Sequence, residues 1–274
     1  MPFGQFSRLA RSVDQRGQSL SQVTGLALSL VSMDRAPRLS FTSQGAQPEA
    51  VVLLLHGGTT DSFHAVHAFE PAVLRMIPFG RGVVRAGVGR IALVRLRYAV
   101  RGWNGAAESP LADARWALDR IAERFRDMPI GLVGHSMGGR VALRVADHGG
   151  VLEGIEGGAH RWGVRSVAAL APWLPDGEPT PMLGKRSLLL AHGTADRLTD
   201  PAKTTELAEN LAAEGGDVEL VKFAGARHSM LFPARPWHDM VAGFMVRTLL
   251  APALEGPTGP PSQLRNWHRP EGSC

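Results

Sequence analysis

The sequence predicts an α/β fold with a mostly parallel central sheet and helices on both faces. Apolar runs of strand length alternate along the chain with longer helical stretches, which is the pattern of a parallel sheet. The 274 residues are 44% hydrophobic, enough for one large core. One apolar run, Ile130 to Val133, enters a glycine-flanked turn from which a helical pattern departs. These three observations favour a single α/β domain.

The individual elements follow from runs of apolar residues bounded by turn residues. The predicted strands are Arg38 to Thr42, Ala50 to His56, Arg90 to Tyr98, Ile130 to Val133, Val164 to Ala171, Ser187 to His192 and Val218 to Phe223. The predicted helices are Ser62 to Met76, Leu111 to Phe125, Ser136 to Asp147, Ala202 to Ala213 and Trp237 to Leu250. The helix at Leu111 places Ala114, Leu118 and Ile121 on one face, which is the spacing of an amphipathic helix that packs on a sheet.

The glycine-flanked turn is the pentapeptide Gly134 to Gly138, with Ser136 at its centre. A strand that turns abruptly into a helix brings the chain back over its own backbone, so the flanking positions must be small. Ser136 is then held at the apex with its hydroxyl exposed, as in a nucleophile elbow. The backbone N–H of Met137 lies at the positive end of the following helix and points toward whatever Ser136 attacks.

An acid and a base follow two later strands. Asp196 comes after the strand that starts at Ser187, and His228 comes after the strand Val218 to Phe223. A serine hydroxyl is a weak nucleophile at neutral pH, so it needs an imidazole base within hydrogen-bond reach. The imidazole in turn needs a carboxylate that fixes its tautomer and stabilises the imidazolium. Ser136, Asp196 and His228 therefore form a candidate catalytic triad. Asp176, which follows the preceding strand, is the alternative acid.

The chain order Ser136, Asp196, His228, with each residue beyond a predicted strand, resembles the α/β-hydrolase family. In that family the loop after an early strand donates a backbone N–H to the developing oxyanion. The resemblance assigns this role to the loop after Val51 to Leu55, which begins at His56. Gly58 best matches the donor position, Thr59 is the alternative, and Met137 supplies the second N–H.

The connection between the strands at Val164 and Ser187 is short, since only Pro172 to Arg186 lie between them. Many α/β hydrolases insert a helical lid at this point, and this chain has no room for one. The resemblance therefore implies an α/β-hydrolase fold without an inserted lid, similar to dienelactone hydrolases, small esterases and cutinase-like enzymes. Trp103 and Trp173 follow strand ends and are candidate apolar walls of an open cleft that binds substrate.

These residues predict a serine hydrolase that cleaves carboxylic esters or related acyl bonds through an acyl-enzyme intermediate. A thioesterase or an acyltransferase would use the same groups, and so would a cofactor-free lyase or perhydrolase. A non-catalytic binding module is the remaining alternative, although such proteins usually lose a member of the triad. We expect no cofactor and no metal, because His64 and His67 have no third ligand at suitable spacing.

Composition sets the expected partners and location. The net charge is +5, but the basic residues are scattered along the chain, without the basic run or aromatic motif typical of nucleic-acid binding. We therefore expect a small-molecule acyl substrate and no nucleic acid. The one cysteine, Cys274, allows no internal disulfide, and no apolar run reaches the length of a membrane span. We therefore expect a cytoplasmic protein, and the oligomeric state stays open. The expected segments are an N-terminal helical arm (1–36), an α/β-hydrolase domain (37–251) and a loosely attached tail rich in proline and glycine (252–274).

Overall fold

The computed structural model describes residues 35–42, 47–147, 162–231, 234–250 and 263–267. The chain divides into Met1–Ala36 and Pro37–Cys274, and all that follows concerns the second unit. The helical arm predicted for residues 1–36 lies outside the described residues except at its last two positions.

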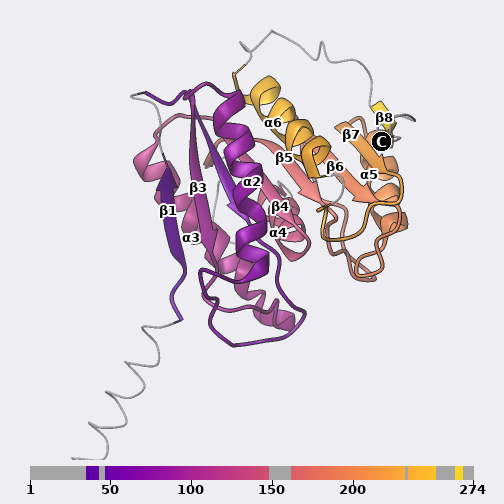
Figure 1. The fold of residues 1–274 in the computed structure, drawn as a ribbon, viewed down its shortest axis with the longest axis horizontal. Coiled ribbons are helices and arrows are strands. Elements are labelled where there is room, and N and C mark those ends of the chain that lie inside the picture. Colours follow the sequence, from indigo (N-terminus) through magenta and orange to yellow (C-terminus); the bar gives the residue numbers. More distant parts are fainter. Residues whose placement is uncertain (1–34, 43–46, 148–161, 232–233, 251–262, 268–274) are drawn as a thin grey trace, which may run out of the picture. The chain divides into compact units, whose positions relative to one another are not determined.

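An eight-stranded sheet runs through the second unit in the order β1-β3-β2-β4-β5-β6-β7-β8 (Figure 1). Among the described strands, only β1 pairs antiparallel to its neighbour, and the other neighbouring pairs are parallel. The strands are β1 (Arg38–Thr42), β2 (Ala50–Leu55), β3 (Ile91–Arg97), β4 (Ile130–His135), β5 (Val164–Leu170), β6 (Ser187–Gly193), β7 (Asp217–Phe223) and β8 (Gln263–Trp267). The predicted fold class is confirmed.

Helices cover both faces of this sheet. They are α2 (Pro71–Ala86), α3 (Ser109–Arg124), α4 (Met137–Ala146), α5 (Pro201–Ala213) and α6 (Ala234–Leu250), with a short 3₁₀ helix, η1, at Gly105–Ala107. The buried side chains of α2 and α6 share one apolar core, and those of α3, α4 and α5 share the other. In Figure 1, α2 and α6 accordingly lie in front of the sheet and α3 and α4 lie behind it.

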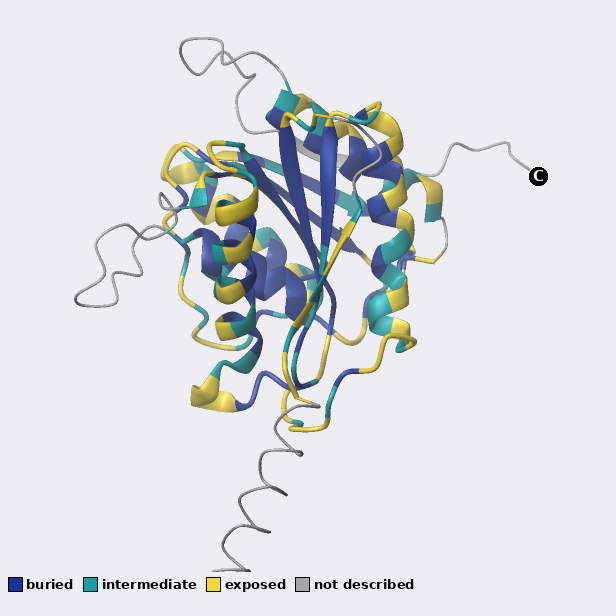
Figure 2. Cartoon of the chain, turned by 90° about the vertical axis from the view of Figure 1, so that its left-hand side faces the viewer, coloured by how far each residue is buried: buried dark blue, intermediate teal, exposed yellow. Residues whose placement is uncertain are grey.

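Strand β2 shows why both layers are needed. Each of its six residues is at most 1% exposed, so neither face of the strand meets solvent. Successive side chains of a strand point to opposite faces. Val51 and Leu53 accordingly belong to the core with α3 and α4, whereas Val52 and Leu54 belong to the core with α2 and α6. Figure 2 shows the central strands as buried along their length between the two helical layers.

The parallel strands place their carboxyl ends at one edge of the sheet, and this edge gathers the candidate residues. The loops that leave β2, β4, β6 and β7 begin at His56, Ser136, Thr194 and Ala224 respectively. In open α/β sheets, ligands bind in the crevice outside the carboxyl ends of the strands. Residues 171–186, between β5 and β6, form neither helix nor strand, so no lid domain is inserted there.

One helix lies elsewhere than the sequence predicts. Helix α2 covers Pro71–Ala86, whereas the prediction was Ser62 to Met76, so the first nine predicted positions are wrong. Those residues form an irregular loop because they pair with a distant segment. The N–H of Ser62 donates to Asn104 Oδ1 at 2.7 Å, and Thr59 forms a parallel bridge with Gly102. Pro71 then starts the helix at a position where its missing N–H costs nothing.

The C-terminal prediction is also wrong in part. Strand β8 (Gln263–Trp267) pairs parallel with β7 inside the segment that was expected to be a loosely attached tail. The local sequence carries too weak a pattern to show this strand, whose partner β7 lies far away in the sequence. The remaining strands and helices are confirmed, with ends that differ from the prediction by at most three residues.

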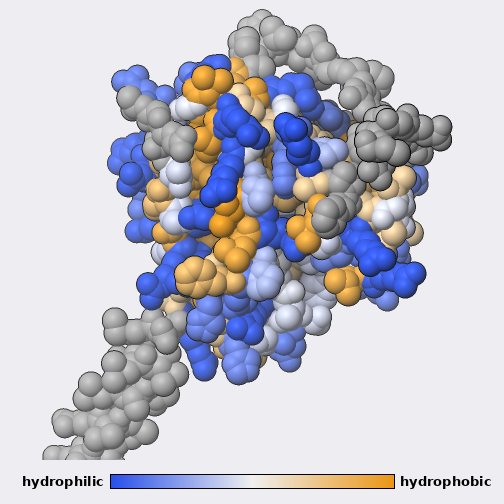
Figure 3. Space-filling model, in the orientation of Figure 1, coloured by the Kyte–Doolittle hydropathy of each residue, from blue (hydrophilic) through white to orange (hydrophobic). Residues whose placement is uncertain are grey.

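The surface view shows one face of the molecule. On the visible part of the face that carries α2 and α6, hydrophilic and hydrophobic side chains are mixed (Figure 3). Within the described residues, no helix combines the length and the apolar character needed to cross a membrane.

Candidate active site

Ser136 lies at a sharp turn between β4 and α4 with backbone angles φ 57° and ψ −121°. A positive φ is uncommon for a residue with a side chain, and such strain is found at functional sites. Two glycines make the turn possible. A Cβ on Gly134 would lie 2.0 Å from the carbonyl oxygen of Gly138, and a Cβ on Gly138 would lie 2.2 Å from that of Leu55. The strand and helix therefore approach so closely that only glycine fits at either position.

The neighbouring strand holds this turn in place. The N–H of Ser136 donates to the carbonyl of Leu170 at the end of β5, at 2.9 Å. The carbonyl of Ser136 accepts from the N–H of Trp173 at 3.1 Å. Between Ile130 and Leu143, Ser136 is the one residue that is not buried. The turn is thus fixed by backbone bonds while its serine keeps access to the cleft.

Asp196 and His228 meet directly above the ends of β6 and β7. His228 Nδ1 lies 2.7 Å from Asp196 Oδ2, and Asp196 is only 8% exposed. The other carboxylate oxygen, Oδ1, accepts from the backbone N–H groups of Leu198 and Thr199 at 2.8 and 3.1 Å. Burial by itself would raise the pKa of Asp196, but hydrogen bonds from two histidines and from these N–H groups hold it well below its usual range. Asp196 is therefore ionised at neutral pH.

The alternative acid lies elsewhere. The carboxylate of Asp176 is fully open to solvent and pairs with Lys203 on α5, which lowers its pKa. No hydrogen bond joins Asp176 to His228 within the described residues. The structure thus brings Asp196, and not Asp176, to the candidate base.

A second histidine, His135, ties the base to the strand that carries Ser136. His135 Nε2 lies 3.0 Å from the carbonyl oxygen of His228, to which a protonated Nε2 donates, and the centroids of the two rings are 4.7 Å apart. Burial lowers the pKa of His135 to about 3, so its ring is neutral. Sequence reasoning assigned no role to His135, although a histidine at the end of a buried strand is an unusual polar residue in a core.

This buried histidine predicts a pH effect on stability. Unfolded, His135 binds a proton below about pH 6.5, whereas folded it stays neutral down to about 3. Between these values the unfolded chain binds one more proton, so His135 makes stability fall as pH falls, by about 1.4 kcal/mol per pH unit. We expect His135→Gln, which keeps a donor near the same carbonyl, to lose this contribution. Denaturant unfolding of both proteins from pH 7 to 4 measures it, and parallel stability curves would contradict it.

The loop after β2 lies against the elbow. A Cβ on Gly57 would come within 3.3 Å of Ser136 Cβ, and one on Gly58 would lie 2.5 Å from Met137 Cε. The side chain of His56 joins this loop to the end of β3. Its Nδ1 lies 2.6 Å from the carbonyl of Gly57, and its Nε2 lies 3.2 Å from the N–H of Tyr98. Burial lowers the pKa of His56 to about 4, and a neutral ring protonated at Nδ1 satisfies both contacts.

The backbone N–H groups of this loop and of the first turn of α4 are the candidate oxyanion donors. The N–H of Thr59 already donates to the carbonyl of Arg101 at 3.0 Å, so it is not free to bind an oxyanion. The N–H of Gly58 has no hydrogen-bond partner in the part of the chain that the structure describes. Met137 is the first residue of α4, where an α-helix leaves its N–H groups without intrahelical partners. Gly58 and Met137 therefore remain the candidate oxyanion donors.

The two tryptophans differ in their access to the cleft. Trp103 is only 3% exposed, and the guanidinium of Arg140 lies 3.7 Å from the centre of its ring. Trp173 is partly buried and meets Trp103 edge-on, with 6.1 Å between centroids. Arg140 is itself buried and pairs with Glu178 at 2.6 Å. Trp103 therefore belongs to the support of the cleft, and Trp173 is the tryptophan with surface left for a substrate.

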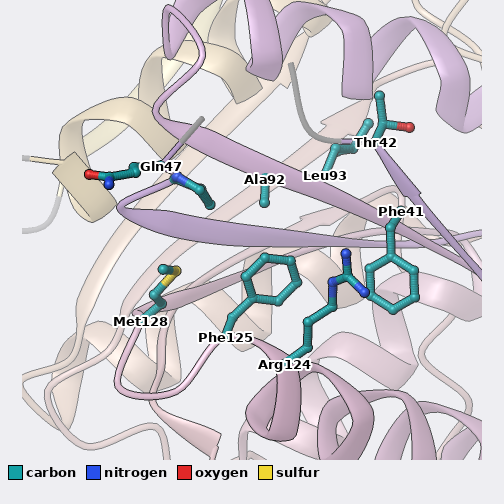
Figure 4. A pocket seen from close by; sticks show the side chains of 9 residues that line it. Phe41, Thr42, Gln47, Ala92, Leu93, Arg124, Phe125 and Met128 are labelled. Atoms are coloured by element: carbon teal, nitrogen blue, oxygen red, sulfur yellow. The ribbon is translucent and has the colours of Figure 1, made fainter. Parts of the chain in front are cut away.

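A groove of about 650 Å³ lies away from these residues (Figure 4). It is lined by the end of β1, the beginning of β3 and the end of α3, with Arg124 between the rings of Phe41 and Phe125. The amino ends of the parallel strands lie at this edge, opposite to Ser136. The groove is not part of the candidate active site.

Comparisons with known proteins agree with this arrangement. Residues 107–243, half of the chain, match the model of the dienelactone hydrolase family, and this range contains Ser136, Asp196 and His228. No curated protein matches the chain as a relative. Many solved structures share its fold.

Three of these structures illustrate the likeness. A propionate-bound esterase, Est2 from Thermogutta terrifontis, has a TM-score of 0.60 at 17% identity over 79% of this chain and 91% of its own. A lidless α/β serine hydrolase from Xanthomonas campestris has a TM-score of 0.55 at 16% identity over 79% and 91%. Est1E from Butyrivibrio proteoclasticus has a TM-score of 0.54 at 14% identity over 78% and 94%. The fold is thus that of the α/β hydrolases. The chain belongs to the dienelactone hydrolase family and is an enzyme of the carboxylic ester hydrolase type.

Proposed function

We propose that the protein is a serine hydrolase that cleaves esters of small acyl groups through Ser136, His228 and Asp196. Two observations carry the proposal: Ser136 is held at a strained, accessible turn, and His228 places Nδ1 2.7 Å from the buried, ionised carboxylate of Asp196. The family assignment supports ester hydrolysis as the reaction class.

The first half of the reaction forms an acyl-enzyme. Because Asp196 is ionised, His228 donates its Nδ1–H to Oδ2, and its Nε2 is left with a free lone pair. Nε2 takes the proton of Ser136 while Oγ attacks the ester carbonyl carbon. The carbonyl oxygen becomes an oxyanion, which accepts hydrogen bonds from the N–H groups of Gly58 and Met137. The imidazolium of His228 then protonates the departing alcohol.

The second half returns the enzyme to its starting state. His228 Nε2, neutral again, removes a proton from a water molecule that attacks the acyl carbon. A second oxyanion forms in the same place, and the bond from the acyl carbon to Ser136 Oγ breaks. His228 gives its proton to Oγ, and the carboxylic acid leaves. Thioester cleavage or acyl transfer to another acceptor would need only a different leaving group or nucleophile at these steps.

The absence of a lid favours small substrates. Residues 171–186 build no closing element, so a long acyl chain would remain in solvent rather than in an enclosed pocket. Trp173, held by its N–H on the carbonyl of Ser136, is the apolar surface beside the nucleophile. The esterase from Thermogutta terrifontis, which has the same fold, is bound to propionate, a carboxylate with a short chain of this size.

The test is hydrolysis of p-nitrophenyl esters of increasing acyl length. We expect turnover of the acetate and butyrate esters in free solution and a smooth, saturating dependence of rate on concentration. A cleft without a lid has no closed state that an interface could open, so the rate should not jump where the substrate begins to form an emulsion. A sharp rise at that point, or no hydrolysis of the soluble esters, would contradict the proposal.

A further inference from the structure

The carboxylate of Asp196 faces a second imidazole. His192, near the end of β6, places Nε2 at 3.1 Å from Asp196 Oδ2, the same oxygen that His228 contacts at 2.7 Å. The Oγ1 of Thr199 donates to this oxygen at 2.9 Å. His192 is 1% exposed, so its ring is enclosed by protein.

The partners of His192 determine which nitrogen carries its proton. A bare imidazole nitrogen would repel a carboxylate oxygen, so Nε2 must carry a proton to stay at 3.1 Å from Oδ2. The other nitrogen, Nδ1, lies 2.7 Å from the hydroxyl oxygen of Thr204 on α5. With the ring proton on Nε2, Nδ1 accepts a hydrogen bond from that hydroxyl. Thr204 is 0% exposed and is therefore a fixed partner.

Asp196 thus lies between two imidazoles, those of His228 and His192. One imidazole is His228, the base in the proposed function. The other is His192, which is joined to Thr204 in a closed part of the core. No substrate can reach Thr204, so the buried imidazole has no reaction of its own and acts only on the carboxylate.

We propose that His192, with its tautomer set by Thr204, is a positioning residue that holds Asp196 Oδ2 toward His228. The inference rests on the proposed function, in which Asp196 is the acid of the triad. The backbone N–H groups of Leu198 and Thr199 fix Oδ1, and His192 with the Thr199 hydroxyl fixes Oδ2. Without His192, Asp196 Oδ2 loses one hydrogen-bond donor, and the carboxylate is free to turn away from His228 Nδ1.

The first test reads the protonation of both rings in the unmodified protein. In ¹⁵N spectra of histidine-labelled protein at neutral pH, we expect His192 to carry a proton on Nε2 and His228 to carry one on Nδ1. A bare Nε2 in His192 would overturn the inference, because that nitrogen would then have nothing to donate to Asp196.

The second test uses variants and ester turnover. His192→Leu should lower kcat by about 10- to 100-fold, with KM nearly unchanged. Losses of this size are typical when an outer hydrogen-bond partner that orients a metal-site residue is removed. His192→Gln should recover most of kcat, because its amide nitrogen can occupy the position of imidazole Nε2. His238→Leu, which removes a partly buried histidine from α6, is the matched control and should leave kcat unchanged. A folded His192→Leu protein with normal kcat, or a failure of glutamine to restore it, would overturn the inference.

Thr204→Val keeps the test decisive if His192→Leu does not fold. Valine fills the space of threonine without a hydroxyl, so His192 loses its partner at Nδ1 and kcat should fall by a few-fold, about 3- to 10-fold for one neutral hydrogen bond. Unchanged turnover in this variant would count against the inference. Failure of the proposed function looks different. In that case Ser136→Ala would retain the esterase activity, whereas failure of the present inference alone leaves Ser136 essential and only His192 dispensable.

Discussion

Asp196→Ala should lower kcat for ester hydrolysis by roughly 10⁴-fold while the protein stays folded. The buried carboxylate is the group that receives the Nδ1 proton of His228 at 2.7 Å, so without it the imidazole has no fixed tautomer and its cation has no counter-charge. His228→Ala should cost more, roughly 10⁶-fold, because Ser136 then has no base. Steady-state kinetics on p-nitrophenyl butyrate measures both losses.

Asp176→Ala is the matched control for the acid. The carboxylate of Asp176 is exposed and pairs with Lys203. A surface ion pair contributes little free energy, so kcat of Asp176→Ala should stay within about two-fold of the wild-type value. A large loss in Asp176→Ala together with an active Asp196→Ala would show that the acid is wrongly assigned. An active His228→Ala would contradict the mechanism itself.

Gly134→Ala should destabilise the protein by about 3 kcal/mol or more, because the added methyl group has no room. Its Cβ would lie 2.0 Å from the carbonyl oxygen of Gly138 and 2.7 Å from the backbone nitrogen of Gly139. Backbone atoms cannot move aside as a flexible side chain can, so the strand and helix must separate at the elbow. Thermal and denaturant unfolding measure the loss, and the remaining folded protein should have little esterase activity.

Gly243→Ala provides the comparison at a glycine with open space. Gly243 lies within α6 and is exposed, and a Cβ there would meet nothing within 4 Å. Replacing glycine by alanine in such a helix should stabilise the protein by about 0.5 to 1 kcal/mol. Equal stability for Gly134→Ala and Gly243→Ala would mean that the elbow is not as tightly packed as the structure has it.

The sequence predicts the strands best because their signal is local. Ala50–Leu55 and Ile130–His135 are buried on both faces, so each reads as a continuous apolar run. The loop at residues 62–70 is misread as helix because its conformation depends on Asn104, which is 42 positions from Ser62. Strand β8 is missed for a similar reason, since each of its residues pairs with a β7 residue 44 positions earlier, as Gln263 does with Glu219. Contacts between distant segments leave no periodic pattern in either segment.

The same division holds for the candidate site. Ser136, Asp196 and His228 can be proposed as a triad from the sequence because each follows a strand in an order that has chemical meaning. The supporting histidines cannot, since a role for His135 or His192 depends on which atoms lie beside the ring in the folded chain. The available signal was a polar residue within an apolar strand, which favours a buried, hydrogen-bonded group without naming its partner. For Trp103, which the sequence proposes as an apolar wall of the cleft, the structure adds the packing of Arg140 against its ring.

The central claim is that Ser136 is an activated nucleophile, and covalent labelling tests it most directly. A fluorophosphonate should add once to the folded protein, as read by intact-protein mass, with the adduct mapped to Ser136 by peptide analysis. Ser136→Ala should gain no adduct, and Asp196→Ala should react far more slowly because its base is no longer oriented. A folded wild-type protein that gains no adduct, or a Ser136→Ala protein that is labelled at the wild-type rate, would contradict the assignment.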